Sequence, residues 1–205
     1  MYKYVFKRVI DVIASLILLI LFSPIIATLI LILFITNNGK PFYFQKRPGK
    51  NEQIFTIIKF KTMNDKKDKN GMLLKDTYRL TRIGRIIRKT SLDEILQLIN
   101  VLIGTMSIIG PRPLLIKYLP FYNDDERIRH SVRPGITGLA QISGRNRLDW
   151  DNRLKKDIEY VSNLSFYLDL KIFLKSFLII IAAKNIDIDT SNSEIEDFDI
   201  YRQNK

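Results

Sequence analysis

The stretch Ser91-Leu92-Asp93-Glu94-Ile95-Leu96-Gln97-Leu98-Ile99-Asn100-Val101-Leu102 decides how the rest of the chain is organised. Ser91 is followed three residues later by Glu94, just before an apolar-periodic run. This is the capping-box pattern, and it predicts a helix with Ser91 as its N-cap. The apolar side chains recur at the i, i+3, i+4 and i+7 spacing and are expected to face a core: Leu92, Ile95, Leu96, Ile99 and Leu102.

Two adjacent acids, Asp93 and Glu94, then lie in the first turn of the predicted helix. Asp93 shares a stripe with Gln97 and Asn100, so it is expected to point away from the core. The simpler interpretation is that these carboxylates only stabilise the helix dipole. Cations on both sides favour a chemical role: Arg82, Arg85, Arg88 and Lys89 precede the pair, and Pro111-Arg112-Pro113 and Gly144-Arg145 follow it. Acids among arginines suit a phosphate group and a divalent metal.

The composition restricts the chemistry that is available. The chain has 205 residues, of which 46% are hydrophobic, and this suffices for one domain with an appendage. It contains no cysteine and one histidine, His130, so disulfides, thiolate nucleophiles and zinc sites are excluded or disfavoured. The formal net charge of +12 points to a polyanionic partner, which could be a nucleic acid, an anionic lipid surface or a phosphorylated small molecule.

The N-terminal segment predicts membrane attachment. Lys3, Lys7 and Arg8 precede a run from Val12 to Ile35 that holds no charged residue. A helix of about 24 residues spans roughly 36 Å, enough to cross the hydrocarbon core. The run is too long for a signal-peptide core and no small-residue cleavage site follows it, so the segment is expected to be retained.

Ser23-Pro24 interrupts this run and predicts a kink, because proline removes a helical hydrogen bond while Ser23 can donate to the freed carbonyl. Basic residues flank the run on both sides, with Lys40, Lys46, Arg47 and Lys50 after it. The positive-inside rule therefore places both ends in the cytoplasm, which favours a re-entrant membrane helix over residues 1–38. A helix that spans the membrane is the alternative.

The rest of the chain predicts a mainly helical α+β fold. Residues 39–185 are expected to form a cytoplasmic, membrane-associated catalytic domain with short strands and amphipathic interfacial helices, and residues 186–205 a flexible acidic tail. The run 54–61 is rich in β-branched and aromatic residues and predicts a strand with Lys59 and Lys61 on one face. Residues 150–163 and 166–183 predict helices. The second of these is strongly apolar and long enough to lie along a membrane surface.

Several motifs in fixed order resemble the bacterial sugar transferase family: Lys7-Arg8-Val9-Ile10-Asp11, Ser23-Pro24, Gln45-Lys46-Arg47-Pro48-Gly49, Lys59-Phe60-Lys61-Thr62-Met63, Ser91-Leu92-Asp93-Glu94, Gly110-Pro111-Arg112-Pro113 and Arg133-Pro134-Gly135-Ile136-Thr137-Gly138. These enzymes are monotopic phosphoglycosyl transferases. The resemblance extends to about Ala183 and is closest to the minimal, PglC-like type.

The resemblance implies a reaction in which a UDP-sugar and a polyprenyl (undecaprenyl) phosphate give a polyprenyl diphosphate sugar and UMP, with Mg²⁺. This is the first membrane step of glycan assembly. The resemblance implies that Asp93 is the nucleophile and a metal ligand and that Glu94 completes the catalytic pair. It associates further residues with substrate and phosphate binding: Lys59, Arg88, Arg112, Arg145 and Asn146. The sugar is not identified; N,N′-diacetylbacillosamine is one candidate.

The resemblance also implies a location on the cytoplasmic face of the bacterial inner membrane, contact with its lipids, and pathway glycosyltransferases as partners, with no nucleic acid. Two other functions remain open. A membrane-tethered basic adaptor that binds anionic lipid or nucleic acid would explain the charge and the anchor, but not two acids among arginines. A phosphatase acting on lipid phosphates would also use an aspartate. Release of UMP from a UDP-sugar separates the transferase from both.

Overall fold

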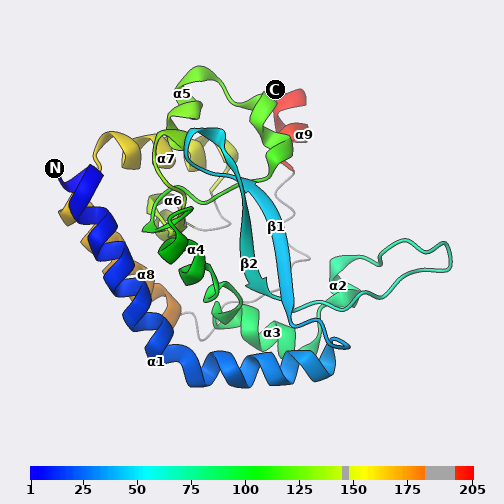
Figure 1. Cartoon of the computed structure of the whole chain (residues 1–205). Helices are drawn as coiled ribbons and strands as arrows, with labels where there is room; N and C mark the ends of the chain where they lie inside the picture. The colour runs from blue at the N-terminus through cyan, green and yellow to red at the C-terminus, as the bar shows by residue number, and fades with distance from the viewer. Residues whose placement is uncertain (145–147, 183–196) are drawn as a thin grey trace.

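The N-terminal helix borders the whole molecule. The computed structural model describes residues 1–144, 148–182 and 197–205, and in it a π-helical turn, η1 (Tyr2–Phe6), runs into α1 (Lys7–Thr36). The α1 helix bends sharply near its middle, and its two halves enclose one side of the body (Figure 1). By length and composition, the helical stretch Tyr2–Thr36 can cross a membrane.

The bend in α1 has a local cause. Pro24 lies inside the helix and cannot donate to the carbonyl of Ile20, four residues earlier. Ser23 Oγ donates to that same carbonyl oxygen at 2.7 Å. The prediction that Ser23 would satisfy the freed carbonyl is therefore confirmed, and so is the predicted kink.

Polar contacts attach the first half of α1 to the body. Asp11 is buried and accepts hydrogen bonds from Ser107 Oγ at 2.7 Å and from the Ile108 backbone N–H at 3.1 Å. Lys7 pairs with Asp169 at 2.7 Å. Arg8 donates to the carbonyl oxygens that end a second helix, α4 (Gln97–Ile103). The start of α1 is thus part of the folded domain.

Apolar packing attaches the second half. Leu29 and Leu33 are buried in a cluster with Phe60, Ile87 and Leu96. Phe60 ends β2 (Ile54–Phe60), which pairs antiparallel with β1 (Phe42–Pro48) around the turn η2 (Lys50–Glu52). The prediction of a strand over 54–61 is confirmed, with its end at Phe60.

An extended arm, residues 64–75, projects from the body after β2 (Figure 1). Three short elements lead back to α4: α2 (Asp76–Arg79), α3 (Arg82–Lys89) and the 3₁₀ turn η3 (Leu92–Glu94). The basic run before the acids is therefore helical, and Thr81 caps it by accepting from the Gly84 backbone N–H at 2.9 Å.

A parallel pair of short strands, β3 (Ser107–Ile109) and β4 (Gly135–Thr137), lies at the centre of the largest core cluster. Between them run η4 (Ile116–Phe121), α5 (Asp124–Arg127) and η5 (Ile128–Ser131). After them come α6 (Leu139–Ser143), α7 (Trp150–Ser162) and α8 (Phe166–Ala182). The described elements confirm the expectation of a mainly helical fold with short strands.

The end of the expected flexible tail is ordered. Residues Phe198–Gln203 form α9, and Phe198 is fully buried against Tyr118, Tyr122 and Trp150. The acidic composition of the tail gave no indication that Phe198 packs in this core, with Tyr201 packed against the same cluster. Residues 183–196 lie outside the described part of the chain.

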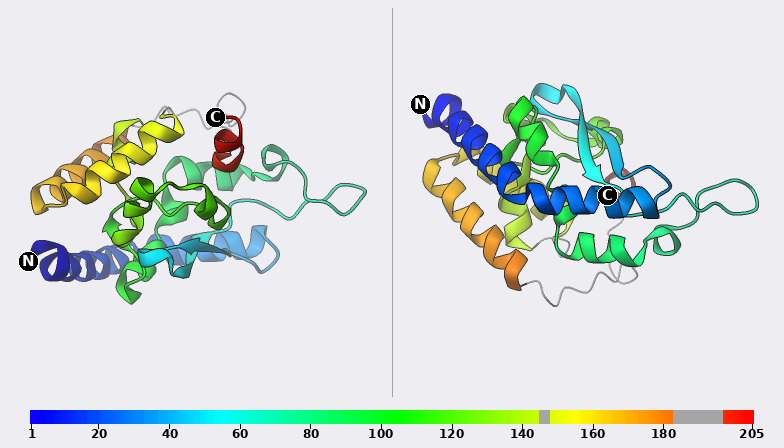
Figure 2. Two further views of the ribbon diagram at one scale, coloured as in Figure 1. Left: turned by 90° about the horizontal axis from the view of Figure 1, so that it is seen from above. Right: turned by 60° about the horizontal axis from the view of Figure 1, so that its bottom comes forward.

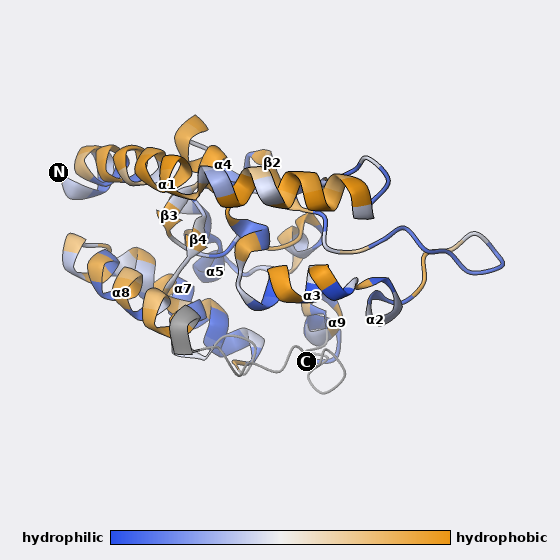
Figure 3. Ribbon diagram, turned by 90° about the horizontal axis from the view of Figure 1, so that it is seen from below, coloured by the Kyte–Doolittle hydropathy of each residue, from blue (hydrophilic) through white to orange (hydrophobic). Residues whose placement is uncertain are grey.

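One face of the molecule is apolar. Figure 3 shows hydrophobic residues along α1, on α3 and along α8, on the face seen from below. In Figure 2 the first half of α1 and α8 flank the body on that side. The exposed residues of α8 include Phe166, Tyr167, Phe173, Leu174, Phe177 and Leu178, and Ile86 and Ile103 add α3 and α4. A face of this kind suits a lipid surface.

Candidate active site

The two acids lie in a 3₁₀ turn rather than in the first turn of an α-helix. Ser91 has a left-handed backbone with φ of 57° and makes no capping hydrogen bond through its side chain, so the capping box predicted from Ser91 and Glu94 is wrong. Leu92–Glu94 forms η3, and α4 begins only at Gln97. The chain makes a tight corner here, and the Glu94 carboxylate contacts Lys59 of β2 and Arg112 of the Pro111–Pro113 segment.

The predicted polar stripe of this region is also wrong. Gln97 and Asn100 are both buried. Asn100 lies against β2, where Nδ2 donates to the Thr56 carbonyl at 2.8 Å and Oδ1 accepts from the Ile58 backbone N–H at 3.2 Å. A polar side chain can be buried in a core when its polar atoms are hydrogen-bonded. The two hydrogen bonds of Asn100 therefore fix α4 to β2, in addition to the apolar packing of α4.

Glu94 lies at the centre of an ion-pair cluster. Arg112 donates to it through Nη1 at 3.0 Å and Nη2 at 2.5 Å, which is a bidentate contact. Lys59 Nζ, on β2, contacts the same carboxylate at 2.6 Å. Burial alone would raise the pKa of Glu94, but Arg112 and Lys59 hold it well below its usual range. Glu94 is therefore ionised and fixed in place.

Asp93 differs from Glu94 in its partners. No hydrogen bond or ion pair joins its carboxylate to another side chain in the described part of the protein. Burial and the charge of Glu94 raise the pKa of Asp93, while Lys59, Arg88 and Arg112 lower it in part. Of the two acids, Asp93 is the one available to a substrate or a metal.

Arg88 reaches the site from α3. Its Nε donates to Thr62 Oγ1 at 2.8 Å, which leaves the terminal guanidinium nitrogens for another partner. Gly84 allows this approach, since a Cβ there would lie 2.0 Å from the Thr62 carbonyl oxygen. The Thr62–Gly84 contact brings α3 against the end of β2, and so it orients Arg88.

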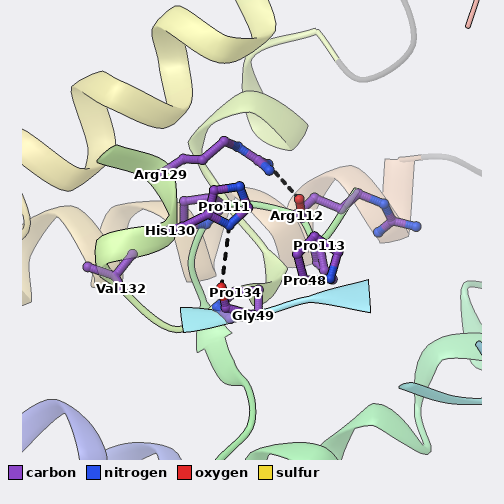
Figure 4. Close-up of a pocket in the computed structure, with 9 residues that line it drawn as sticks. All are labelled: Pro48, Gly49, Pro111, Arg112, Pro113, Arg129, His130, Val132 and Pro134. Carbon is purple, nitrogen blue, oxygen red and sulfur yellow. Dashed lines mark hydrogen bonds between the residues drawn. The ribbon is translucent and has the colours of Figure 1, made fainter. Parts of the chain in front are cut away.

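The backbone of the segment that carries Arg112 is held by Arg129. Arg129 Nη2 donates to the Arg112 carbonyl at 2.7 Å and pairs with buried Asp157 at 2.8 Å. Figure 4 shows Arg129 directed at that carbonyl, while the side chain of Arg112 extends away from the small cavity between them. Together with Pro111 and Pro113, this contact fixes the backbone of Arg112, as expected for a preorganised anion contact.

His130 lines the same cavity. Its Nδ1 lies 3.4 Å from the Gly49 carbonyl oxygen (Figure 4), and burial lowers its pKa to about 4. The imidazole is therefore neutral near pH 7.

Sequence reasoning did not identify two cations of this region. Arg47, at the end of β1, is bonded to Gln45 Oε1 through Nη2 at 2.6 Å, and burial together with the charge of Arg112 lowers its pKa. Arg153 stacks on the Trp150 ring at 4.5 Å, and its pKa is lowered first by burial and also by Arg112. The motif Gln45–Gly49 contains the signal for Arg47. Nothing in the sequence relates Arg153 to Arg112.

The structure brings together four of the predicted site residues around Asp93: Lys59, Arg88, Glu94 and Arg112. Arg145 and Asn146 lie outside the described residues. Among the described residues, no group of three or more acids or histidines forms a metal site. The donor set still fits Mg²⁺, because this ion is commonly held by one or two carboxylates together with substrate phosphates, and the carboxylate of Asp93 is available.

Comparison with known proteins identifies the family. A family model described as bacterial sugar transferase matches residues 2–183. The chain is 48% identical over 168 residues to the "Uncharacterized sugar transferase EpsL" of Bacillus subtilis. The aligned region covers 82% of this chain and 83% of that protein. It is 39% identical over 184 residues to the "UDP-glucose:undecaprenyl-phosphate glucose-1-phosphate transferase" of Klebsiella pneumoniae, across 84% of this chain and 40% of the relative.

A third relative is the "Undecaprenyl-phosphate galactose phosphotransferase" of Salmonella typhimurium, 37% identical over 193 residues, across 85% of this chain and 40% of that protein. The chain thus spans most of EpsL but less than half of the Klebsiella and Salmonella proteins. The family match covers nearly all of the described body, including every residue of the Glu94 cluster. The chain is a transferase that belongs to the bacterial sugar transferase family.

Proposed function

We propose that the protein transfers a sugar 1-phosphate from a UDP-sugar to a polyprenyl phosphate and releases UMP. The observation that carries this is the difference between two adjacent acids in a cationic site. Glu94 is held by Arg112 and Lys59, while Asp93 lies beside it with its carboxylate available. The names of the Klebsiella and Salmonella relatives support undecaprenyl phosphate as acceptor, and they support UDP-glucose as donor or galactose as the transferred sugar.

Asp93 acts as the nucleophile in this proposal. Its carboxylate oxygen attacks the β-phosphorus of the UDP-sugar, and the bond between that phosphorus and the bridging oxygen breaks, so UMP leaves with the electron pair. The product is an acyl phosphosugar on Asp93. A phosphate oxygen of the polyprenyl phosphate then attacks the same phosphorus and frees the carboxylate. Each step forms one bond to phosphorus and breaks another.

The cations stabilise charge during both steps. Among the described residues, the terminal nitrogens of Arg88 have no hydrogen-bond or ion-pair partner, and Arg112 and Lys59 lie around the Glu94 carboxylate next to Asp93. Fixed cations of this kind neutralise the charge that builds up in phosphoryl transfer. Bound Mg²⁺ would be held by Asp93 and the diphosphate, and would add further neutralisation of the leaving UMP. Arg145 and Asn146 remain proposed contacts to the substrate.

The bend at Pro24 supports a re-entrant arrangement in which α1 enters the bilayer from the cytoplasmic side and returns to it. The two halves of α1 both contact the body, through Asp11 in the first and Leu33 in the second. With the body on one side of the membrane, these contacts keep both ends of α1 on that side. The acids then lie where a lipid phosphate and a soluble nucleotide can meet, on the cytoplasmic face of the inner membrane.

The test is an assay of UMP release. The purified chain is incubated with undecaprenyl phosphate, Mg²⁺ and, separately, UDP-glucose, UDP-galactose and UDP-N,N′-diacetylbacillosamine. One UDP-sugar is expected to give UMP together with a polyprenyl diphosphate sugar. An adaptor gives no UMP with any donor, and a phosphatase releases inorganic phosphate from undecaprenyl phosphate without a donor. Either result would refute the transferase.

A further inference from the structure

A second cationic cavity lies at the start of α1. It has a volume of about 130 Å³, far above the roughly 10–15 Å³ that one water molecule needs. Its lining contains five cations and one acid, along with polar and apolar side chains. The cations are Lys3, Lys7, Arg8, Lys50 and Arg133, and the acid is Asp11. The acids and cations of the Glu94 cluster are not part of this lining.

Two of the charged groups are already used. Asp11 accepts from Ser107 Oγ and the Ile108 N–H, and Lys7 pairs with Asp169. Within the described ranges, the partners of Arg8 are the carbonyl oxygens of Val101 and Leu102 and include no acid. The cavity therefore keeps an excess of positive charge that the acids of the described chain leave largely uncompensated.

Besides Arg8, three cations of the lining have no acidic partner within salt-bridge distance among the described residues: Lys3, Lys50 and Arg133. They come from η1, from the β1–β2 turn and from the segment after η5, far apart in the sequence. Arg133 is held by Nε, which donates to the Gly104 carbonyl at 2.7 Å, so its terminal nitrogens are left for another partner. Cations from separate segments that line one cavity indicate that it binds an anionic ligand.

The surroundings of the cavity are apolar. Tyr4 and Leu164 belong to the lining, and Tyr4 is 77% exposed. Val5 and Phe6, the next residues of η1, are also exposed and continue into the apolar surface of α1. A ligand with a phosphate in the cavity would therefore have apolar surface beside it. This combination fits a lipid head group better than a free anion.

We propose that this cavity binds the phosphate of an anionic membrane phospholipid, apart from the catalytic site. The lipid phosphate lies among Lys3, Lys50 and Arg133, and its acyl chains follow η1 and α1. Such a lipid fixes the depth and tilt of the start of α1, and hence the height of the body above the membrane. The proposal does not depend on the reaction that the Glu94 cluster performs.

The experiment measures thermal unfolding of the purified full chain in a nonionic detergent. Dihexanoyl phosphatidylglycerol, dihexanoyl phosphatidylcholine and inorganic phosphate are titrated separately. Phosphatidylglycerol is expected to raise the Tm with saturation, and native mass spectrometry is expected to find one bound lipid per chain. Phosphatidylcholine should act more weakly, because its ammonium group is repelled by the lysines. Inorganic phosphate that matches phosphatidylglycerol at equal concentration would assign the cavity to a free anion and overturn the lipid.

Matched double variants separate the cavity from bulk charge. Lys3→Gln with Lys50→Gln is compared with Lys67→Gln and Lys69→Gln on the projecting arm, which removes the same charge elsewhere. The cavity variant should need at least about tenfold more phosphatidylglycerol for half of the Tm rise, and the arm variant should match wild type. Equal behaviour of the two variants would overturn the proposal.

Two further variants keep the test decisive. Lys3→Arg with Lys50→Arg retains the charge and should respond as wild type does, so a loss of response there would contradict a phosphate site. Arg112→Gln should leave the response to phosphatidylglycerol unchanged. If it abolishes the response, the lipid binds at the Glu94 cluster instead and the separate site is refuted.

Discussion

Arg112 holds Glu94 through both terminal nitrogens, at 3.0 and 2.5 Å, while Asp93 next to it has no comparable partner among the described side chains. The negative charge of the buried Glu94 carboxylate is balanced by Arg112 and Lys59 before any substrate arrives. The two neighbouring carboxylates therefore differ in their partners. Glu94 is paired with the Arg112 guanidinium and the Lys59 ammonium group, and Asp93 has no such ion pair among the described residues. The proposed division of roles follows from this asymmetry.

Replacing Arg112 tests the cationic cluster. Arg112→Ala should lower kcat/KM for UMP release by about 10²–10³-fold, because a fixed charge next to the reacting phosphate is lost. Arg112→Lys should restore only part of this, since lysine cannot make the bidentate contact. Arg85→Ala, on the exposed side of α3, serves as the control and should be nearly wild type. A fully active Arg112→Ala enzyme would remove this residue from the site.

Replacing Asp93 tests the covalent step. Wild-type protein mixed with the UDP-sugar alone should release a burst of up to about one UMP per chain, and intact mass should rise by one phosphosugar. Asp93→Asn should show neither, whereas Asp65→Asn, an exposed acid, should show both. If UMP appears only after polyprenyl phosphate is added and no adduct is trapped, the lipid phosphate attacks directly in a ternary complex.

The topology of α1 can be tested by cysteine labelling, because the chain has no cysteine of its own. Lys3→Cys and Lys50→Cys, made singly, should both react with a membrane-impermeant reagent from the cytoplasmic side only. Pro24→Ala restores the hydrogen bond to Ile20 and should shift part of the population towards a spanning helix of roughly 36 Å over the uncharged run. Periplasmic labelling of the wild-type background at position 3 would establish a spanning helix.

His130 predicts how stability depends on pH. Its folded-state pKa of about 4 is below the unfolded value near 6.5, so the unfolded chain binds more protons between these values. Stability is therefore lost as pH falls from about 6.5 towards 4, by about 2 kcal/mol at pH 5. In detergent, the Tm of His130→Phe should fall less than that of wild type between pH 7.5 and 5. Parallel pH profiles would show that His130 does not contribute.

Asn100 predicts a stability effect at the joint between α4 and β2. Asn100→Ala leaves the Thr56 carbonyl and the Ile58 N–H without their partner in a buried place. A loss of about 2–4 kcal/mol is expected, seen as a Tm lower by several degrees. Asn163→Ala, at the exposed end of α7, should stay within about 0.5 kcal/mol of wild type. Equal Tm values for the two variants would contradict the structural role of Asn100.

Local patterns were sufficient for much of the fold. The β-branched run 54–61 is a strand, the runs 150–163 and 166–183 contain α7 and α8, and Ser23-Pro24 is the site of the bend in α1. Each of these depends on residues close together in the chain. The same holds for the cluster of cations around the acids, because Lys59, Arg88 and Arg112 belong to recognisable motifs.

Non-local contacts account for the errors. The sequence predicts a capping box at Ser91, but Ser91 has a left-handed backbone and Leu92–Glu94 forms a 3₁₀ turn, from which Glu94 contacts Lys59 of β2. The helical pattern places Asn100 on a stripe apart from the core-facing residues, although the backbone of β2 supplies its partners. The roles of Arg47 and Arg153 depend on the approach of β1 and α7 to Arg112, which no pattern in a single segment encodes.

The contacts of Asp11 and Asp169 make the N-terminal helix inseparable from the domain. Removing residues 1–36 would remove Asp11, the acceptor of hydrogen bonds from Ser107 and Ile108. It would also leave buried Asp169 without Lys7, and it would expose the surface that Leu29 and Leu33 cover. A water-soluble version of this protein therefore cannot be made by truncation. It would have to keep the helix and replace its outward-facing residues with polar ones, because here the membrane anchor also serves as part of the hydrophobic core.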